Sequence, residues 1–100
     1  MPVYNVNTLE EFQALLNLPN LLVFKVYANW CGPCQAYKPQ FEQLSNQYGD
    51  NVIFIESDVS NNFVLVTSLP TTLFIKNNQI VDKIYGIDLP LLQQKINQYA

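Results

Sequence analysis

The hydrophobic positions at the start of the chain predict a short strand, a helix and a buried strand, in that order. Val3 to Val6 is a short run suited to a first strand. Thr8-Leu9-Glu10-Glu11 matches a capping box, in which a threonine and a glutamate three residues later cap the start of a helix. The apolar positions with helical spacing are Leu9, Phe12, Leu15 and Leu16, and Pro19 lies past their end. Leu21 to Tyr27 is almost wholly apolar, which is typical of a strand buried on both faces.

A second helix is predicted from about Cys31, and a third strand follows it. The helix carries an apolar stripe spaced three and four residues apart, formed by Cys34, Tyr37, Phe41, Leu44 and Tyr48. Gly49 is suited to end this helix, because glycine readily adopts the left-handed conformation that follows many helices. Val52 to Glu56 then predicts a buried strand. The segment from Ser60 to Ser68 is ambiguous, since it has room for only about two helical turns.

The last third of the chain predicts a hairpin and a final helix. Thr71 to Ile75 and Ile80 to Tyr85 are strands joined through Lys76-Asn77-Asn78-Gln79, a tight turn because asparagine tolerates positive φ. Asp88 is the expected cap of the last helix, which should bury Leu92, Ile96 and Tyr99. This order of elements predicts the α/β class, with a mixed five-stranded sheet flanked by helices on both faces. No linker or repeat divides the chain, so residues 1–100 are expected to form one domain.

Composition narrows the chemistry that such a domain can perform. The 100 residues are 49% hydrophobic, and five lysines against eight acidic residues give a net charge of −3. The absence of arginine argues against nucleic-acid binding and a bidentate phosphate clamp. The absence of histidine excludes Ser-His-Asp hydrolysis, Cys-His protease chemistry and histidine-ligated metal sites. Two cysteines, three residues apart, are the remaining unusual groups.

Neither the amino terminus nor any apolar run indicates export or membrane insertion. Residues 1–6 have no basic region followed by an apolar core, so a signal peptide is not expected. The longest apolar runs are four residues, as in Leu21 to Phe24, so no membrane span is expected. We therefore expect a cytoplasmic protein, and in that reducing compartment a close cysteine pair is more often catalytic or metal-binding than structural.

The cysteine pair lies in Trp30-Cys31-Gly32-Pro33-Cys34, where a buried strand gives way to a helix. At a helix N-terminus, unpaired N–H groups and the macrodipole stabilise an anion, and thiol pKa values there fall from about 8.5 to roughly 3.5–7.5. Cys31 is therefore expected to be the exposed, attacking nucleophile. Cys34 lies one turn inside the helix on its apolar stripe, so it should be shielded and should resolve the mixed disulfide. Pro33 suits the first helical turn.

Three other interpretations of the pair compete with redox chemistry. A zinc or iron–sulfur site normally needs four ligands, so only a metal shared between two chains would fit, and no metal is expected. A structural disulfide closing so short a loop removes little chain entropy. Two inert buried thiols would not account for the position at the junction of strand and helix. Redox chemistry is favoured.

With these residues, the sequence resembles the thioredoxin family over essentially its whole length. The Trp-Cys-Gly-Pro-Cys string is highly specific to thioredoxins, and Ala28 and Pro39 also fall where the family has them. Leu69-Pro70-Thr71 resembles the family's cis-proline segment, whose backbone lies against the active-site disulfide and pairs with the substrate. Gly86 resembles the glycine near the same groove. Without the motif, Pro70 and Gly86 would be interpreted as an edge-strand proline and a strand end.

The resemblance implies a thioredoxin fold and a protein-disulfide reductase. Cys31 and Cys34 would be catalytic, and the expected substrate-binding surface comprises Trp30, Gly32, Pro33, Leu69, Pro70, Thr71 and Gly86. No bound cofactor is expected beyond the redox-active Cys31–Cys34 disulfide, with electrons supplied by an NADPH-dependent thioredoxin reductase. Expected partners are this reductase and protein disulfides, with no nucleic acid or membrane, and the protein is expected to be a monomer. The alternatives are a thioredoxin-fold binding or scaffold subunit, and a more oxidising oxidase or isomerase.

The sequence departs from the family at a buried charged pair and in one connecting segment. The family's buried aspartate on the central strand corresponds to Lys25, and its partner lysine corresponds to Glu56, so the pair is charge-reversed. Three hypotheses follow: Glu56 accepts the proton of Cys34, directly or through water; Lys25 lowers the Cys34 pKa; or Lys25 reaches solvent and neither residue takes part. The stretch between Asp58 and Pro70 is several residues shorter than is typical, so the third helix should be reduced to about one turn. Asn78 stands where the family often has a hairpin glycine.

Overall fold

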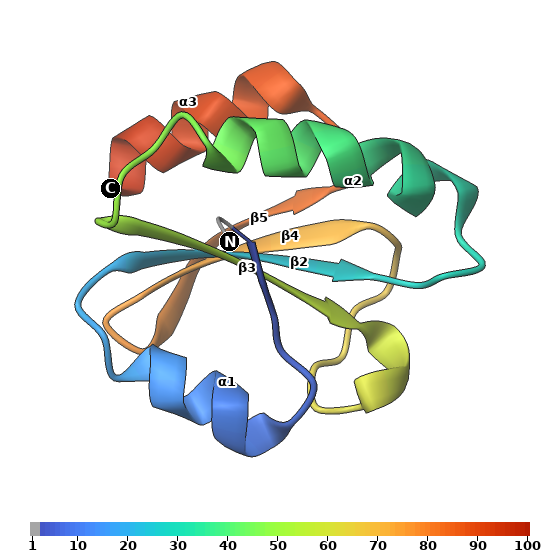
Figure 1. The fold of residues 1–100 in the computed structure, drawn as a ribbon, viewed down its shortest axis with the longest axis horizontal. Coiled ribbons are helices and arrows are strands. Elements are labelled where there is room, and N and C mark those ends of the chain that lie inside the picture. The colour runs from blue at the N-terminus through green and yellow to red at the C-terminus, as the bar shows by residue number, and fades with distance from the viewer. Residues whose placement is uncertain (1–2) are drawn as a thin grey trace.

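The computed structural model describes residues 3–100, which form one mixed five-stranded sheet with helices on both of its faces (Figure 1). The strands lie in the order β1-β3-β2-β4-β5. Their bounds are Val3–Asn5 for β1, Leu21–Tyr27 for β2, Val52–Asp58 for β3, Thr71–Lys76 for β4 and Gln79–Tyr85 for β5. The central strand, β2, is parallel to β3 and antiparallel to β4. At the two edges of the sheet, β1 pairs in parallel with β3, and β5 pairs antiparallel with β4. The predicted α/β class and strand content are confirmed.

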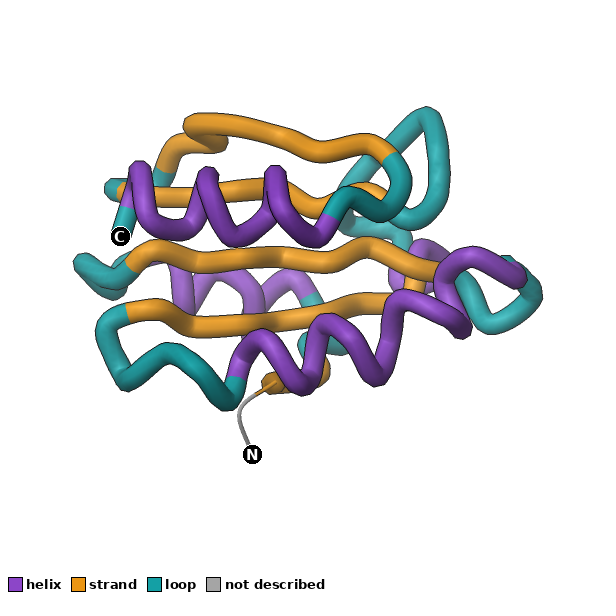
Figure 2. Tube along the Cα trace, turned by 90° about the horizontal axis from the view of Figure 1, so that it is seen from above, coloured by secondary structure: helices purple, strands orange, loops and turns teal. Residues whose placement is uncertain are grey.

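Helices α2 (Gly32–Ser45) and α3 (Leu89–Tyr99) lie side by side over one face of the sheet (Figures 1 and 2), and α1 (Leu9–Leu16) lies on the other. The core beneath α2 and α3 is built around fully buried aromatic and aliphatic side chains, including Phe41, Phe74 and Ile96. The core on the α1 side contains Phe24 and Ile55 from the central strands. Among residues 3–100, no helix is both long enough and apolar enough to cross a membrane.

The start of α1 follows the predicted capping box with one difference. The Thr8 side chain accepts a hydrogen bond from the N–H of Glu11, at 3.2 Å. The Glu11 carboxylate accepts from the Thr8 hydroxyl and from the N–H of Asn7, rather than from the N–H of Thr8. This helix buries none of its residues fully, so the expected apolar stripe packs only partly against the sheet.

Two details of the predicted helices are wrong. Helix α2 ends at Ser45, not at Gly49, and its backbone closes through Asn46 into a turn that contains Tyr48. Tyr48 still packs on the core from this turn. Tyr99 at the end of α3 is only partly buried, because its hydroxyl donates to the Asp82 carboxylate at the molecular surface, at 2.9 Å.

The hairpin between β4 and β5 turns through two asparagines in the left-handed conformation. Asn77 has φ 53° and Asn78 has φ 63°. Two successive residues with positive φ are what a two-residue hairpin turn requires, and asparagine adopts them more readily than most residues. The turn therefore tolerates Asn78 without glycine, as expected.

The third helix is reduced to a single 3₁₀ turn, η1 (Val59–Asn61), which confirms the prediction from segment length. Asp58 caps this turn by accepting from the N–H of Ser60, at 2.9 Å, and Asn62 ends it in the left-handed conformation. Residues 63–70 then run without helix to the start of β4. On the α1 face, no helix covers the part of the sheet formed by β4 and β5 among the residues described (Figure 1).

Candidate active site

The two cysteines lie where β2 ends and α2 begins. Cys31 is the N-cap of α2, and its Sγ accepts a hydrogen bond from the backbone N–H of Cys34 at 3.2 Å. This bond uses one of the N–H groups that a helix leaves unpaired in its first turn. The two cysteines are joined as a disulfide. The same N–H would stabilise a thiolate at Cys31 after reduction, because a charged acceptor strengthens the bond.

The expected difference in exposure between the cysteines is small in this oxidised state. Cys31 is 7% exposed and Cys34 is 3% exposed. The prediction of an exposed Cys31 is therefore wrong for this oxidised state, in which Leu69 from the segment before Pro70 packs against the cysteines. Trp30, by contrast, is 80% exposed beside the pair.

The segment containing Pro70 lies against the disulfide. The Leu69–Pro70 peptide bond is cis, as the resemblance implies, and Leu69 packs against the cysteines. Gly86 donates its N–H to the carbonyl of Pro70 at 2.8 Å. Gly86 has φ 79°, a conformation that favours glycine, and open space surrounds the position that a side chain would take. Thr71 is buried and donates its hydroxyl to the carbonyl of Ser68.

An apolar depression of about 570 Å³ joins the two segments around Cys31. Trp30, Gly32, Pro33 and Leu69 line it, as expected for the substrate-binding surface. Pro70, Thr71 and Gly86, which were also expected to bind the substrate, do not line it. Four further lining residues were not predicted from the sequence: Val59, Val66, Thr67 and Ser68. All four lie in the shortened segment, and the available signal was its apolar run from Phe63 to Val66, which ends two residues before Leu69-Pro70.

The charge-reversed pair lies on the buried side of the cysteines. Lys25 on β2 and Glu56 on β3 are directly opposite each other in the parallel register. The Lys25 Nζ lies 3.1 Å from Glu56 Oε1, and the two side chains are 2% and 10% exposed. Lys25 does not reach solvent, so that hypothesis is wrong. The Lys25 ammonium group is the contact of Oε1, which has no other hydrogen-bond donor among residues 3–100.

Three aromatic rings lie around the Lys25 ammonium group. The ring centres of Tyr27, Tyr37 and Phe41 lie 5.5, 5.5 and 4.9 Å from Nζ. Burial lowers the pKa of Lys25 below 10.5, and the negative charge of Glu56 opposes this shift. Burial also raises the pKa of Tyr37 to about 12, while its hydroxyl shares a 2.8 Å hydrogen bond with Thr72.

A small cavity connects the ion pair to the resolving cysteine. It measures about 50 Å³ and is lined by Lys25, Glu56 and Cys34, together with Tyr27, Asn29, Gln35 and Lys38. A cavity needs only about 10–15 Å³ to hold one water molecule when polar groups line it. The Cys34 side chain, the Glu56 carboxylate and the Lys25 ammonium group thus share one polar space that is large enough for water. Among residues 3–100, no three potential ligands cluster in a way that could hold a metal ion.

The sequence and the fold match thioredoxins. The thioredoxin family model matches residues 3–98. Thioredoxin 1 of Plasmodium falciparum is 32% identical over 100 residues, with 95% of each chain covered. The crystal structure of Malassezia sympodialis thioredoxin superimposes with a TM-score of 0.89 at 32% identity, covering 97% of this chain and 90% of the other.

A larger relative contains only a short region similar to this chain. The peptide-N(4)-(N-acetyl-beta-glucosaminyl)asparagine amidase of Caenorhabditis elegans is 35% identical over 106 residues. The match covers 99% of this chain and 18% of the amidase. The chain therefore spans less than a fifth of that protein. The match over residues 3–98, the common fold and the close cysteine pair at the start of α2 together show that the chain belongs to the thioredoxin family.

Proposed function

We propose that this chain reduces protein disulfides by dithiol–disulfide exchange through Cys31 and Cys34. The observation that carries the proposal is the position of Cys31 at the N-cap of α2, where the N–H of Cys34 bonds its sulfur, opposite the cis peptide before Pro70. A helix N-terminus favours the thiolate, which is the reactive form in disulfide exchange. The opening beside Cys31 is the route by which a substrate disulfide reaches that sulfur.

In the first step, the Cys31 thiolate attacks one sulfur of a substrate disulfide. A bond forms between Cys31 Sγ and that sulfur, the substrate S–S bond breaks, and the other substrate sulfur leaves as a thiolate. In the second step, the Cys34 thiolate attacks Cys31 Sγ, which releases the second substrate thiolate and closes the Cys31–Cys34 disulfide. Two electrons pass to the substrate, and both of its sulfurs end as thiols after taking up protons.

The second step requires Cys34 to lose a proton in a buried position. Glu56 is the carboxylate that shares the cavity with Cys34, and apart from Lys25 its Oε1 has no hydrogen-bond donor among residues 3–100. We assign Glu56 as proton acceptor, acting through water in that cavity. The positive charge of Lys25 lines the same space and favours the thiolate of Cys34. Both groups are positioned by the direct pairing of β2 with β3.

The substrate chain is held in an extended form along the segment before β4. The backbone N–H and C=O of Leu69 have no hydrogen-bond partner among residues 3–100, so they are free to pair with an added strand. Trp30, Gly32 and Pro33 supply the opposite wall of the depression. Pro70, Thr71 and Gly86 fix the backbone at its end through the Gly86–Pro70 and Thr71–Ser68 hydrogen bonds.

We propose that an NADPH-dependent thioredoxin reductase recharges the oxidised pair, in the cytoplasm and with the chain as a monomer. The test is the reduction of a protein disulfide by the chain in the presence of this reductase and NADPH. The reaction is monitored as the loss of NADPH absorbance. Wild type should turn over, Cys31→Ser should not, and Cys34→Ser should accumulate a mixed disulfide visible by mass. Full activity of Cys31→Ser would overturn the assignment of the nucleophile. If the variant with both cysteines replaced by serine keeps the biological function of the chain in cells, the chain is instead a binding module.

Equilibration of the pair with glutathione tests the direction of electron flow. A reductant of protein disulfides should have a potential near the thioredoxin value of about −270 mV. A pair that stays reduced at a poise near that of disulfide isomerase, about −180 mV, would instead indicate an oxidase or isomerase. Glu56→Gln tests the proton route separately: it should slow resolution of a preformed mixed disulfide while the first attack by Cys31 keeps its rate, and an unchanged resolution rate would contradict the route.

A further inference from the structure

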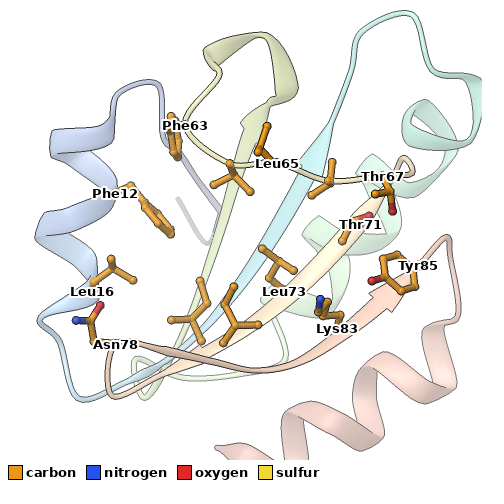
Figure 3. A pocket seen from close by; sticks show the side chains of 14 residues that line it. Phe12, Leu16, Phe63, Leu65, Thr67, Thr71, Leu73, Asn78, Lys83 and Tyr85 are labelled. Atoms are coloured by element: carbon orange, nitrogen blue, oxygen red, sulfur yellow. The ribbon is translucent and has the colours of Figure 1, made fainter.

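A second apolar groove lies beside the active-site depression, on the face of the sheet that α1 covers only in part. It measures about 460 Å³. Figure 3 shows Phe12 and Phe63 on one side of it and Tyr85 with Lys83 on the other. Its floor is formed by β4, where Leu73 points into the groove (Figure 3).

The groove exists because the segment between β3 and β4 is too short to cover the sheet. After the single turn η1, residues 63–67 cross one side of the groove without forming a helix. The side chains left open are large and apolar: Leu65 is 94% exposed, Tyr85 is 59% exposed and Ile80 is 57% exposed. A contiguous apolar surface of this kind marks an interaction site more often than scattered single residues do.

The groove adjoins the depression around Cys31. Val66 and Thr67 line both cavities, and Thr71, which follows Pro70, lines the groove. A polypeptide held along Leu69 at the disulfide can therefore extend directly into the groove. This shared wall points to the substrate chain as the occupant.

The charge of the groove specifies this occupant further. Lys83 is the only charged residue in its lining, and its ammonium group has no ion-pair partner among residues 3–100. The chain as a whole has a net charge of −3, so Lys83 is a local positive site on an acidic protein. An acidic side chain flanked by apolar ones would complement both features.

We propose that this groove binds a segment of the substrate polypeptide, apolar with one carboxylate, that adjoins the disulfide being reduced. The proposal rests on the proposed function and names a class of substrate for it. Contacts made equally before and during thiol exchange lower KM and leave kcat unchanged. The groove should therefore select substrates by affinity and leave the chemistry at Cys31 as it is.

The test compares three disulfides as substrates in the reductase-coupled assay. One is a peptide disulfide whose flank carries leucine, phenylalanine and one glutamate, the second has serines and glutamine in that flank, and the third is a small aromatic disulfide with no peptide. Wild type should favour the apolar, acidic peptide by about tenfold in kcat/KM, the effect of burying one or two apolar side chains in a pocket. The difference should lie in KM.

Groove variants and matched controls locate the effect. The double substitution Leu65→Gln with Tyr85→Thr changes two exposed side chains in the groove, and Leu9→Gln with Tyr4→Thr changes two exposed side chains outside it. The groove variant should lose the preference to within about twofold and keep wild-type kcat on the small disulfide, whereas the control keeps both. Lys83→Gln should lower kcat/KM about threefold for the glutamate peptide only, and added salt should abolish that difference.

The outcomes separate this proposal from the proposed function. If wild type reduces all three disulfides but treats the two peptides alike, the groove proposal is overturned and the reductase stands. If wild type reduces none of the three disulfides, the proposed reductase function is overturned. The groove is then tested by NMR titration of the oxidised protein with the apolar peptide lacking cysteine. Saturable chemical-shift changes at the amides of groove residues, lost in the groove variant, would support the groove proposal. The absence of such changes in wild type would overturn it. A concentration-dependent dimer removed by the groove substitutions would also overturn it, because a second copy would then be the occupant.

Discussion

The ion pair between Lys25 and Glu56 predicts strong energetic coupling beneath the active site. Their side chains are 2% and 10% exposed, so neither charge is well hydrated. Removing one partner leaves the other charge buried without its counter-ion, whereas replacing both with apolar side chains removes both desolvation costs. The experiment is a double-mutant cycle with Lys25→Met, Glu56→Leu and the combination of the two.

The structure ranks the three variants. Lys25→Met should destabilise by about 3 kcal/mol, the low end for a broken buried pair, because the cavity beside Glu56 has room for water. Glu56→Leu should cost less, about 2 kcal/mol, since Lys25 keeps its aromatic neighbours and can lose its proton. The double variant should lie within about 1 kcal/mol of wild type or above it, which gives a coupling free energy of about 4 kcal/mol or more.

The measurement is urea unfolding of the oxidised protein at pH 7, followed by far-UV circular dichroism and extrapolated to water. Equal denaturant dependence across the four proteins would show that the compactness of the unfolded state is unchanged. If the two single effects add up to the double effect within about 0.5 kcal/mol, the charges are not coupled and the reasoning is refuted.

The same pair predicts how stability changes in alkaline solution. Burial lowers the pKa of Lys25 below 10.5; Glu56 opposes the shift, Lys38 adds to it and Glu42 weakly opposes it. Between the folded pKa and 10.5, the unfolded chain binds more protons at this site, so the contribution of Lys25 to the free energy of unfolding rises with pH. Below the folded pKa the penalty is fully present. In Glu56→Leu the rise should begin at lower pH than in wild type, and in Lys25→Met it should be absent.

Three further predictions concern single contacts. Tyr37→Phe should cost about 1–2 kcal/mol, because the buried Thr72 hydroxyl loses its partner, and in a spectrophotometric titration it should remove the tyrosine that ionises near pH 12; unchanged stability would contradict the buried hydrogen bond. Asp82→Asn should cost less than about 1 kcal/mol at pH 7, because the carboxylate, whose pKa the Lys95 hydrogen bond lowers, is partly exposed. Its stabilisation is present above the ordinary pKa of 3.8 and is lost as pH falls through the lowered value, so wild type and variant should converge in acid unfolding. Gly86→Ala should cost about 1 kcal/mol in thermal unfolding, because φ is 79° there, and no loss would mean that this backbone readily relaxes.

The elements of the fold could be predicted where one local signal dominates. The run from Leu21 to Tyr27 is buried over nearly its whole length, as its composition requires for a central strand. Cys31 and Asp88 each cap a helix, because a side-chain acceptor stands directly before an apolar periodic segment. The end of α2 could not be predicted from Gly49, because the helix closes earlier through Asn46 and leaves Tyr48 in a turn that still reaches the core. Hydrophobic spacing alone does not distinguish those two arrangements.

The active site was predictable in its residues and less so in its shape. The motif located Cys31 and Cys34. Counting positions from the motif paired Lys25 with Glu56, and the register of β2 with β3 places these two residues opposite each other. The low exposure of Cys31 follows from how the segment before Pro70 folds over it, which depends on contacts distant in sequence. The apolar groove is the part of the sheet that the shortened segment does not cover. The length of this segment can be read from the sequence, but the side chains that it leaves exposed cannot.

The energetics of the buried pair bear directly on why it lies there. A buried ion pair is weak support for stability, since apolar residues of similar volume often do as well or better. If the double variant is as stable as wild type while resolution by Cys34 slows, the pair contributes to the reaction and not to folding. The location agrees with this, because Lys25 and Glu56 line a cavity that Cys34 shares. The pair also remains matched when its two charges exchange strands, since the register places the two residues opposite each other whichever strand carries the lysine. What the exchange alters is which charge projects from the central strand next to the resolving thiol. The rate of resolution, measured on a trapped mixed disulfide across pH, is therefore where this chain should differ from thioredoxins that carry the opposite arrangement.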